Sequence, residues 1–190
     1  MAQTDRNRWD DRYRSRPFVP RPPDPFLLKI ADQLPTAGRA LDLAGGDGRH
    51  AIWLARRGLQ VTIADISEVA LAQARAAARA AALAVDTVAV DFEAESPPPG
   101  PWDLIVCVLY LDRPLLATIQ TLLAPGGLFV FVQPNRSNLE RHTHAAGYLL
   151  EPGEAPSLLP GMRLLRYDEC WDERGQHEAR ILATRAIGKA

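Results

Sequence analysis

A short aliphatic segment that runs straight into a glycine-rich turn constrains this sequence more than any other feature. Residues 41–50 read LDLAGGDGRH, with Gly45, Gly46 and Gly48 inside the turn. Glycines in such a turn allow positive φ angles and let a ligand approach the backbone, and the start of a following helix offers unpaired N–H groups. We therefore predict a strand, a ligand-binding turn and a helix, which together form the first unit of an open α/β sheet.

The rest of the chain repeats this alternation of short aliphatic runs and helical stretches, which is typical of parallel β-α-β units. The predicted strands cover residues 40–43, 60–64, 87–90, 104–109 and 128–133. Ser67 is a good helix N-cap, and Glu68 in the first turn favours the dipole of a helix that ends near Leu83. Residues 96–101 read SPPPGP and contain too much proline for a helix, so this crossover is predicted to be short.

The last part of the chain has a different pattern. Two strand-like runs, residues 162–171 and 177–186, flank the polar segment DERGQ and predict an antiparallel hairpin. Together these runs predict an α/β fold: a Rossmann-like, seven-stranded, mostly parallel sheet with helices on both faces and a C-terminal antiparallel hairpin.

Length and charge limit the organisation and the partners of the chain. The 190 residues suit a single domain, in which we expect residues 1–38 to form a lead-in that covers the ligand site and residues 39–190 to form the core. Lys and Arg number 22 and Asp and Glu number 23, so the net charge of −1 supplies no positive field for a nucleic acid. The longest apolar run, residues 104–111, is too short to cross a membrane, and the N-terminal residues lack the apolar core of a secretory signal. We therefore expect a cytoplasmic protein, monomeric or homodimeric, that binds neither nucleic acid nor membranes.

Acidic side chains stand at the ends of three consecutive predicted strands. Asp42 belongs to the first strand, Asp65 ends the second at 19 residues after Gly46, and Asp91 with Phe92 ends the third. A carboxylate after the second strand is placed to accept hydrogen bonds from both hydroxyls of a ribose. A carboxylate and an aromatic ring after the third strand suit the amine and the face of a base. The three acids therefore predict a nucleoside-bearing cofactor along the carboxyl edge of the sheet.

A dinucleotide is the alternative ligand for this edge. The spacing Gly46-x-Gly48-x-x-Ala51 also fits the dinucleotide fingerprint, and Asp65 suits a ribose in either case. The 38-residue lead-in, the Asp91-Phe92 pair, the PGG turn at residues 125–127 and the C-terminal hairpin all argue against a dinucleotide.

Several further segments share a pattern with one known family. They are WDDRY at residues 9–13, VTIAD at 61–65, VDF at 90–92, WDLIV at 102–106, YLDRPLL at 110–116 and LAPGGL at 123–128. With the glycine turn they make the chain resemble the class I S-adenosylmethionine-dependent methyltransferases, most closely the small bacterial branch with tellurite-resistance and thiopurine-type enzymes. The resemblance covers nearly the whole chain. One departure is Ala44, which stands where the family motif D-x-G-x-G-x-G has its first glycine.

The resemblance implies S-adenosylmethionine as the cofactor and a role for each matching residue. Asp65 would hold the ribose, Arg12 would bind the carboxylate of the cofactor, and the stretch from Cys107 to Leu109 would pass beneath the sulfonium. The remaining implied cofactor residues are Trp9 and Tyr13 as a cover, Asp42, Ala44, Gly45, Gly46 and Gly48 beside the methionine part, and Ile66, Asp91 and Phe92 around adenine. Ordinary packing is the alternative explanation for Trp9 and Tyr13, and burial on a central strand is the alternative for Cys107.

Methyl transfer requires a nucleophile held in line with the sulfonium and shielded from water. The predicted catalytic residues on the acceptor side are Tyr110, Arg113, Arg141 and His142, with Gln133, Asn135, Arg136 and His144 nearby in sequence. We expect a small-molecule acceptor, with a soft or anionic nucleophile favoured, and no metal, because a His-x-His pair alone does not make a metal site. The alternative for Arg136, Arg141 and His142 is a solvated loop. The alternative function is that of a methyltransferase-fold sensor or partner protein that binds the cofactor without catalysis.

Overall fold

A computed structural model describes residues 2–16, 18–143 and 146–185 of the chain. Its α-helices are α1 (Ala2–Arg14), α2 (Pro25–Lys29), α3 (Arg49–Arg56), α4 (Glu68–Ala80) and α5 (Arg113–Leu122). Short 3₁₀ turns are η1 (Ala31–Gln33), η2 (Arg136–Glu140), η3 (Ala146–Tyr148) and η4 (Ala155–Leu158). The strands are β1 (Arg39–Leu43), β2 (Gln60–Asp65), β3 (Asp86–Ala89), β4 (Trp102–Val108), β5 (Leu123–Pro134), β6 (Met162–Trp171) and β7 (His177–Arg185).

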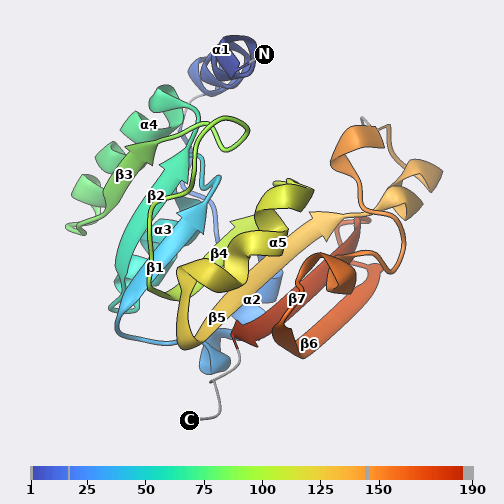
Figure 1. The fold of residues 1–190 in the computed structure, drawn as a ribbon. Coiled ribbons are helices and arrows are strands. Elements are labelled where there is room, and N and C mark those ends of the chain that lie inside the picture. The colour runs from blue at the N-terminus through green and yellow to red at the C-terminus, as the bar shows by residue number, and fades with distance from the viewer. Residues whose placement is uncertain (1, 17, 144–145, 186–190) are drawn as a thin grey trace.

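The strands form a seven-stranded sheet in the order β3-β2-β1-β4-β5-β7-β6 (Figure 1). Strands β1 to β5 run parallel, β7 pairs antiparallel with β5, and β6 pairs antiparallel with β7. The predicted fold class, including the C-terminal hairpin, is confirmed. Strand β5 begins earlier than predicted because Leu123 pairs with Trp102 of β4. Ala186, the last residue of the predicted hairpin, lies outside the described residues.

Side chains that alternate along the central strands build a core on each face of the sheet. On β4, Ile105 and Cys107 join the cluster that includes α5, whereas Leu104 and Val106 join the cluster that includes α2, α3 and α4. These β4 side chains are all fully or almost fully buried. Helices on both faces explain why β4 is apolar along nearly its whole length rather than apolar at every second residue.

The connections between strands follow the local signals in the sequence. The Ser67 hydroxyl accepts a hydrogen bond from the Ala70 N–H and caps α4, as predicted. Helix α4 ends at Ala80, slightly before the predicted end near Leu83, and the proline-rich residues 96–101 contain no helix. The crossover from β3 to β4 is therefore short, which leaves the carboxyl edge of these strands accessible.

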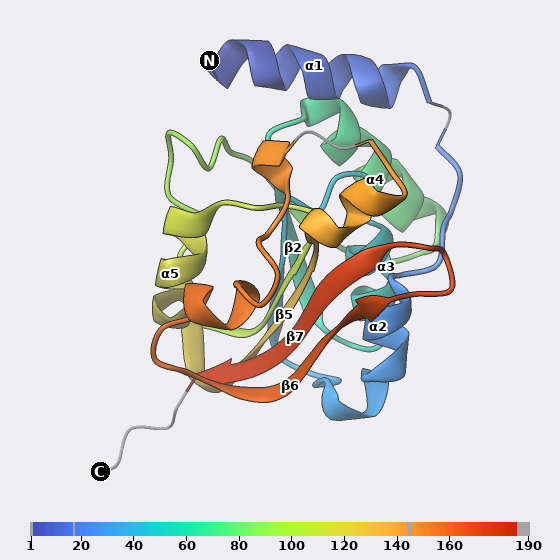
Figure 2. The same cartoon turned by 90° about the vertical axis from the view of Figure 1, so that its right-hand side faces the viewer.

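The lead-in, residues 1–38, divides into two parts with different roles. Helix α1 lies across the carboxyl edge of the sheet, where a cover was expected (Figure 2). Residues of α2 and the turn after it do not cover this edge, because Phe26, Leu27 and Ile30 are buried in the core against α3. The expectation of a lead-in that only covers the site is therefore corrected for residues 25–34. No described helix is long and apolar enough to cross a membrane.

Candidate cofactor and acceptor site

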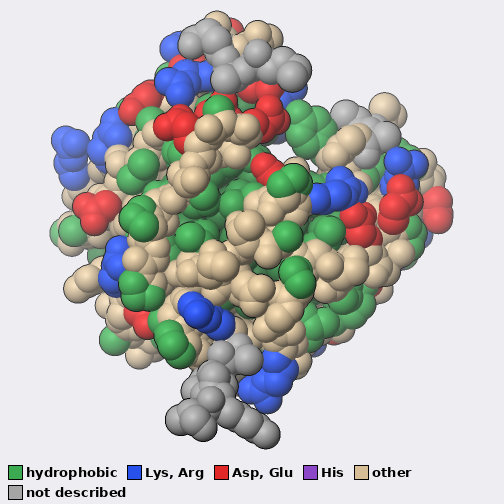
Figure 3. Space-filling model, in the orientation of Figure 1, with side chains coloured by type: hydrophobic (Ala, Val, Ile, Leu, Met, Phe, Trp, Pro, Cys, Tyr) green, Lys and Arg blue, Asp and Glu red, His purple; other side chains and the backbone are tan. Residues whose placement is uncertain are grey.

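A cavity of about 860 Å³ lies beneath α1 at the carboxyl edge of the sheet. It extends from the segment after β3, past the glycine turn, to the ends of β4 and β5 and the turn of the β6–β7 hairpin. In the space-filling view the surface is hollowed between α1 at the top and the segment that follows β5 (Figure 3). This is the edge at which open α/β sheets bind ligands.

The glycine turn forms the floor of the cavity next to β1. Ala44, Gly46 and Gly48 have positive φ angles of 54°, 55° and 79°. Ala44, which departs from the family motif, thus adopts a left-handed conformation that glycine takes more readily. A Cβ on Gly46 would collide with the hydroxyl of Tyr13, which closes over the turn from α1. Glycine is favoured at position 46 because it adopts this positive φ without strain.

Asp65 stands at the end of β2 and is tied to the glycine turn. Its two carboxylate oxygens accept hydrogen bonds from the Gly46 N–H at 2.8 Å and from the Ser67 N–H at 2.9 Å. Burial raises the pKa of Asp65 to about 6, although these backbone N–H groups act in the opposite direction. Asp65 lines the cavity and has further lone pairs for a ligand that donates hydrogen bonds.

The segment after β3 forms the wall of the cavity beyond Asp65. Asp91 accepts a hydrogen bond from the Glu93 N–H at 3.1 Å through Oδ1, but its buried Oδ2 has no hydrogen-bond partner among the described residues. The Phe92 ring lies 5.7 Å from the Tyr110 ring, centroid to centroid. An unpaired acceptor beside an aromatic ring suits a base that carries an exocyclic amine.

Helix α1 is fastened over the cavity at several points. Asp10 Oδ1 accepts hydrogen bonds from the Ser67 hydroxyl at 2.6 Å and the Val69 N–H at 3.3 Å, and Gln73 donates to the Tyr13 carbonyl at 3.0 Å. On the other side, Arg8 donates to the Tyr148 hydroxyl at 3.1 Å. The Arg12 guanidinium lies 5.0 Å from the Trp9 ring centroid. Helix α1 therefore bridges α4 and η3 above the cavity.

Most predicted cofactor residues meet at this cavity, and three do not. Those that line it are Trp9, Arg12, Tyr13, Ala44, Gly45, Gly46, Asp65, Ile66, Asp91 and Phe92. Asp42 instead accepts a hydrogen bond from the Ala51 N–H at 3.0 Å and so holds the start of α3 beneath the turn. Gly48 lies where a Cβ would stand 2.9 Å from Ala74 Cβ of α4, so it serves helix packing. Cys107 is buried in the core, and this burial raises the pKa of its thiol.

The predicted catalytic set requires a larger correction, because only Tyr110 of that set lines the cavity in the described part of the chain. Arg113 forms an ion pair with Glu154, and Arg141 stacks 3.9 Å from the Trp171 ring centroid. His142 contacts the Gly175 carbonyl at 2.7 Å. These side chains fasten the segment after β5 to the hairpin and to η4. None of these three side chains lines the cavity, so the structure gives no support to the prediction that they face the methyl group.

The neighbouring candidates after β5 also differ in placement. Asn135 donates a hydrogen bond to Glu169 at 2.6 Å, and Arg136 forms an ion pair with Glu151 at 2.8 Å. Gln133 lines the cavity, whereas His144 lies outside the described residues.

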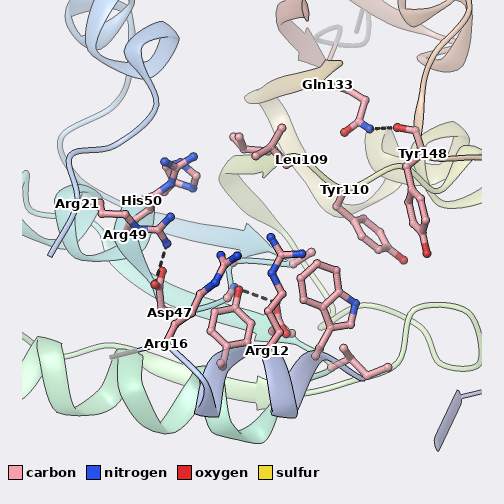
Figure 4. A pocket seen from close by; sticks show the side chains of 18 of the residues that line it. Arg12, Arg16, Arg21, Asp47, Arg49, His50, Leu109, Tyr110, Gln133 and Tyr148 are labelled. Carbon is pink, nitrogen blue, oxygen red and sulfur yellow. Dashed lines mark hydrogen bonds and ion pairs between the residues drawn. The ribbon is translucent and has the colours of Figure 1, made fainter. Parts of the chain in front are cut away.

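Sequence reasoning missed the basic end of the cavity. Figure 4 shows Arg12 and Arg16 on one side and Arg21 with Arg49 on the other, all directed toward the same space. Arg21 forms an ion pair with Asp47 at 2.8 Å. Burial and the neighbouring Arg21 lower the pKa of the Arg49 guanidinium. The arginine-rich lead-in was visible in the sequence, but no spacing signal connects it with Arg49.

Leu109 ends the stretch that the resemblance places beneath the sulfonium, but no signal in the sequence marks its backbone conformation. It follows β4 with a φ of 62°, and 56% of its surface is exposed although it is a large apolar residue. Leucine rarely adopts this backbone conformation, and such outliers cluster at ligand sites. In Figure 4 Leu109 lies between the basic end and the part of the cavity that holds Tyr110, Gln133 and Tyr148.

Comparison with known proteins agrees with this geometry. One solved structure with this fold is TehB from Haemophilus influenzae, with a TM-score of 0.72 and 20% sequence identity over 84% of this chain and 61% of that chain. Another is magnesium protoporphyrin IX methyltransferase from Synechocystis PCC 6803 with bound SAH, with a TM-score of 0.75 and 16% identity over 97% of this chain and 99% of that chain. These likenesses show the fold, which the chain shares with a methyltransferase that was solved with bound SAH.

Sequence comparison adds the domain family. Residues 40–127 match a family model described as a methyltransferase domain. The tRNA 5-carboxymethoxyuridine methyltransferase of Escherichia coli (strain K12) is 32% identical over 126 residues, which cover 62% of this chain and 48% of that protein. The chain thus spans about half the length of the curated relatives it matches. The resemblance to class I S-adenosylmethionine-dependent methyltransferases is confirmed, and S-adenosylmethionine is the cofactor of that class.

Proposed function

We propose that this protein binds S-adenosylmethionine in the cavity beneath α1 and transfers its methyl group to a small-molecule acceptor. The observation that carries the proposal is the row of groups along one sheet edge: Asp91 and Phe92 after β3, Asp65 after β2, and the Gly46 turn after β1. Buried Asp91 Oδ2 has no hydrogen-bond partner in the described part of the chain and suits the adenine amine, and Asp65 suits the ribose hydroxyls. Gly46 has no side chain, so the methionine part of the cofactor can approach its backbone closely.

Methyl transfer from S-adenosylmethionine requires the protein mainly to position the acceptor and to exclude water. When bound, S-adenosylmethionine supplies a methyl group already activated by its positive sulfur. Tyr13 and Trp9 in α1 would exclude water from above, and Leu109 would hold the acceptor side of the cavity apolar. Such orientation and desolvation account for a large part of the rate enhancement in displacements of this kind.

The kind of acceptor is also part of the proposal. A cavity of about 860 Å³ roofed by α1 suits a small molecule, and the net charge of −1 does not favour a nucleic acid. The anionic preference expected from Arg141 and His142 loses its support because they do not line the cavity. Arg16 and Arg49 do line it, in addition to Arg12, which is assigned to the carboxylate of the cofactor, and they support an acceptor that carries an anionic group.

Calorimetry with S-adenosylhomocysteine (SAH) tests the cofactor proposal. We expect wild-type protein to bind SAH more tightly than NAD. Replacing Asp65 with alanine should weaken SAH binding about 100-fold, because a charged acceptor for the ribose hydroxyls is lost. Equal SAH affinity of the wild type and Asp65→Ala, or tighter binding of NAD, would contradict the proposal.

An acceptor screen that measures SAH production tests the catalytic half. Small thiols, amines, hydroxyl compounds and oxyanions should include the productive acceptor. Unmodified tRNA belongs in the same screen, because the Escherichia coli relative is a tRNA methyltransferase. SAH binding without transfer to any of these acceptors would favour the alternative, a cofactor-binding sensor or partner protein.

A further inference from the structure

The strongest unexplained feature of the cavity is one oxygen atom of Gln133. This side chain lies near the end of β5 and is 3% exposed. Its Nε2 donates a hydrogen bond to the Tyr148 carbonyl at 2.5 Å, and a carbonyl can only accept, so the orientation of the amide is determined. Oε1 therefore faces the other way, toward the side of the cavity where Leu109 lies (Figure 4).

Gln133 Oε1 is buried and has no hydrogen-bond partner among the described residues. A buried acceptor without a donor is costly, and native structures keep such atoms rare. A ligand that donates a hydrogen to Oε1 removes this cost, whereas a ligand without a donor leaves it in place. The atom therefore discriminates between ligands by their ability to donate a hydrogen bond.

The adenosine part of the proposed cofactor cannot be this ligand. Asp91 follows β3 and Gln133 lies near the end of β5, and β2, β1 and β4 lie between these two strands. Neighbouring strands are spaced about 4.8 Å apart, so β3 and β5 are separated by roughly 19 Å. Asp65 on β2 and Gln133 are separated by three such spacings. Gln133 thus belongs to the far end of the cavity, beyond the glycine turn.

The surroundings of Gln133 define the rest of this ligand. Tyr110, Tyr148 and Leu109 supply aromatic and apolar walls around it. Arg16 and Arg49, which form no ion pair with a described carboxylate, direct positive charge into the same cavity. A small, flat molecule with an anionic group and a hydrogen-bond donor satisfies all three kinds of contact.

We propose that Gln133 selects the methyl acceptor: a small anionic molecule with a hydroxyl or amine whose hydrogen is donated to Gln133 Oε1. This inference rests on the proposed function and narrows its acceptor. Molecules of the same shape and charge without the donor are rejected, because they leave Oε1 buried and unpaired.

A matched pair of probes tests this selection without knowledge of the natural acceptor. Protein saturated with SAH is titrated with 4-hydroxybenzoate and with 4-fluorobenzoate, which has nearly the same shape but no donor. We expect the hydroxy compound to bind about tenfold more tightly, the ratio typical of one net hydrogen bond. Gln133→Leu should bring the ratio close to one by weakening the hydroxy compound alone, and Gln133→Met should do the same if the leucine variant fails to fold.

A glutamine-to-leucine substitution away from the cavity serves as the control. Gln60 is the exposed first residue of β2, and Gln60→Leu should leave the tenfold ratio unchanged. Equal affinity of the two probes for the wild type, an unchanged ratio in the Gln133 variants, or failure of both probes to bind the SAH complex would overturn the proposal. Failure of the wild type to bind SAH would instead refute the proposed function itself.

Discussion

The type of a residue at this site does not by itself determine whether its side chain points into the cavity. Asp65 and Asp42 are both carboxylates on neighbouring parallel strands, yet Asp65 lines the cavity and Asp42 holds the Ala51 N–H beneath it. The difference follows from position: Asp65 is the last residue of its strand, whereas Leu43 continues β1 after Asp42. Side chains within a strand point into one of the two cores, and those at its end are free to face a ligand.

The raised pKa of Asp65 predicts that cofactor affinity depends on pH. Burial raises the pKa of this carboxyl to about 6, so acidification below that value protonates it in the ligand-free protein. Ribose hydroxyls donate best to the ionised form. We therefore expect SAH affinity to be constant above about pH 7 and to fall toward tenfold per pH unit below pH 6.

Calorimetry between pH 5 and pH 8 measures this dependence. Asp65→Asn, which cannot ionise, serves as the control and should bind SAH weakly but with a nearly flat pH profile. A wild-type affinity that stays constant down to pH 5 would show that Asp65 does not accept from the ligand in its ionised form.

At the scale of elements, helix α1 shows how a polar segment becomes a fixed part of the site. Its sequence, AQTDRNRWDDRYR, has little apolar surface to bury. The helix is held instead by hydrogen bonds between Asp10 and the start of α4, where Ser67 connects it with Asp65. Docking of α1 and placement of Asp65, the proposed ribose-binding carboxylate, are therefore linked through one series of hydrogen bonds.

Loss of this link should accelerate cofactor release. Asp10→Ala removes the acceptor for the Ser67 hydroxyl and the Val69 N–H, so we expect SAH to dissociate about tenfold faster, which corresponds to about 1.4 kcal/mol. Hydrogen exchange of residues 2–14 should rise in the same variant. Stopped-flow displacement of SAH measures the rate.

Asp11 provides the matched control for Asp10. Its side chain is 75% exposed and pairs with Arg14 on the same helix. Asp11→Ala should therefore leave both the SAH dissociation rate and the exchange of α1 unchanged. Identical rates in the two variants would mean that α1 does not retain the ligand.

At the scale of the whole molecule, the C-terminal hairpin is tied to the N-terminal lead-in. Arg174 in the hairpin turn forms ion pairs with Asp24, which precedes α2, and with Asp172 and Glu178. Asp24 and Glu178 are almost fully buried, and burial raises the pKa of Glu178. The connection joins residues 150 positions apart beside the cavity.

Removal of Arg174 should lower the global stability of the protein. The side chain of Arg174 is 42% exposed, so solvent screens part of its attraction to Asp24 and Glu178. We expect Arg174→Ala to lower the free energy of unfolding by about 1–2 kcal/mol, because buried Asp24 loses its ion pair and Glu178 keeps only the one with Arg180. Urea denaturation measures the change. Arg163→Ala, at an exposed arginine of β6, should change stability by less than about 0.5 kcal/mol, and an equal loss in both variants would contradict the argument.

The sequence by itself determined the order and type of the main elements and the cofactor end of the cavity. Strand runs, the Ser67 cap, the proline-rich crossover and the hairpin are local signals, and each was recognisable within a few residues. The glycine turn, Asp65 and Asp91 could be placed together because all parallel strands end at one edge of the sheet.

Tertiary structure alone decided the acceptor end. Arg113, Arg141 and His142 follow the right strands, but contacts with Glu154, Trp171 and Gly175 turn them away from the cavity. Arg16, Leu109 and Tyr148 come from segments far apart in the chain and meet only after α1 and η3 are docked. Their directions depend on long-range packing and ion pairs rather than on local backbone geometry, and such contacts leave no periodic signal in the sequence.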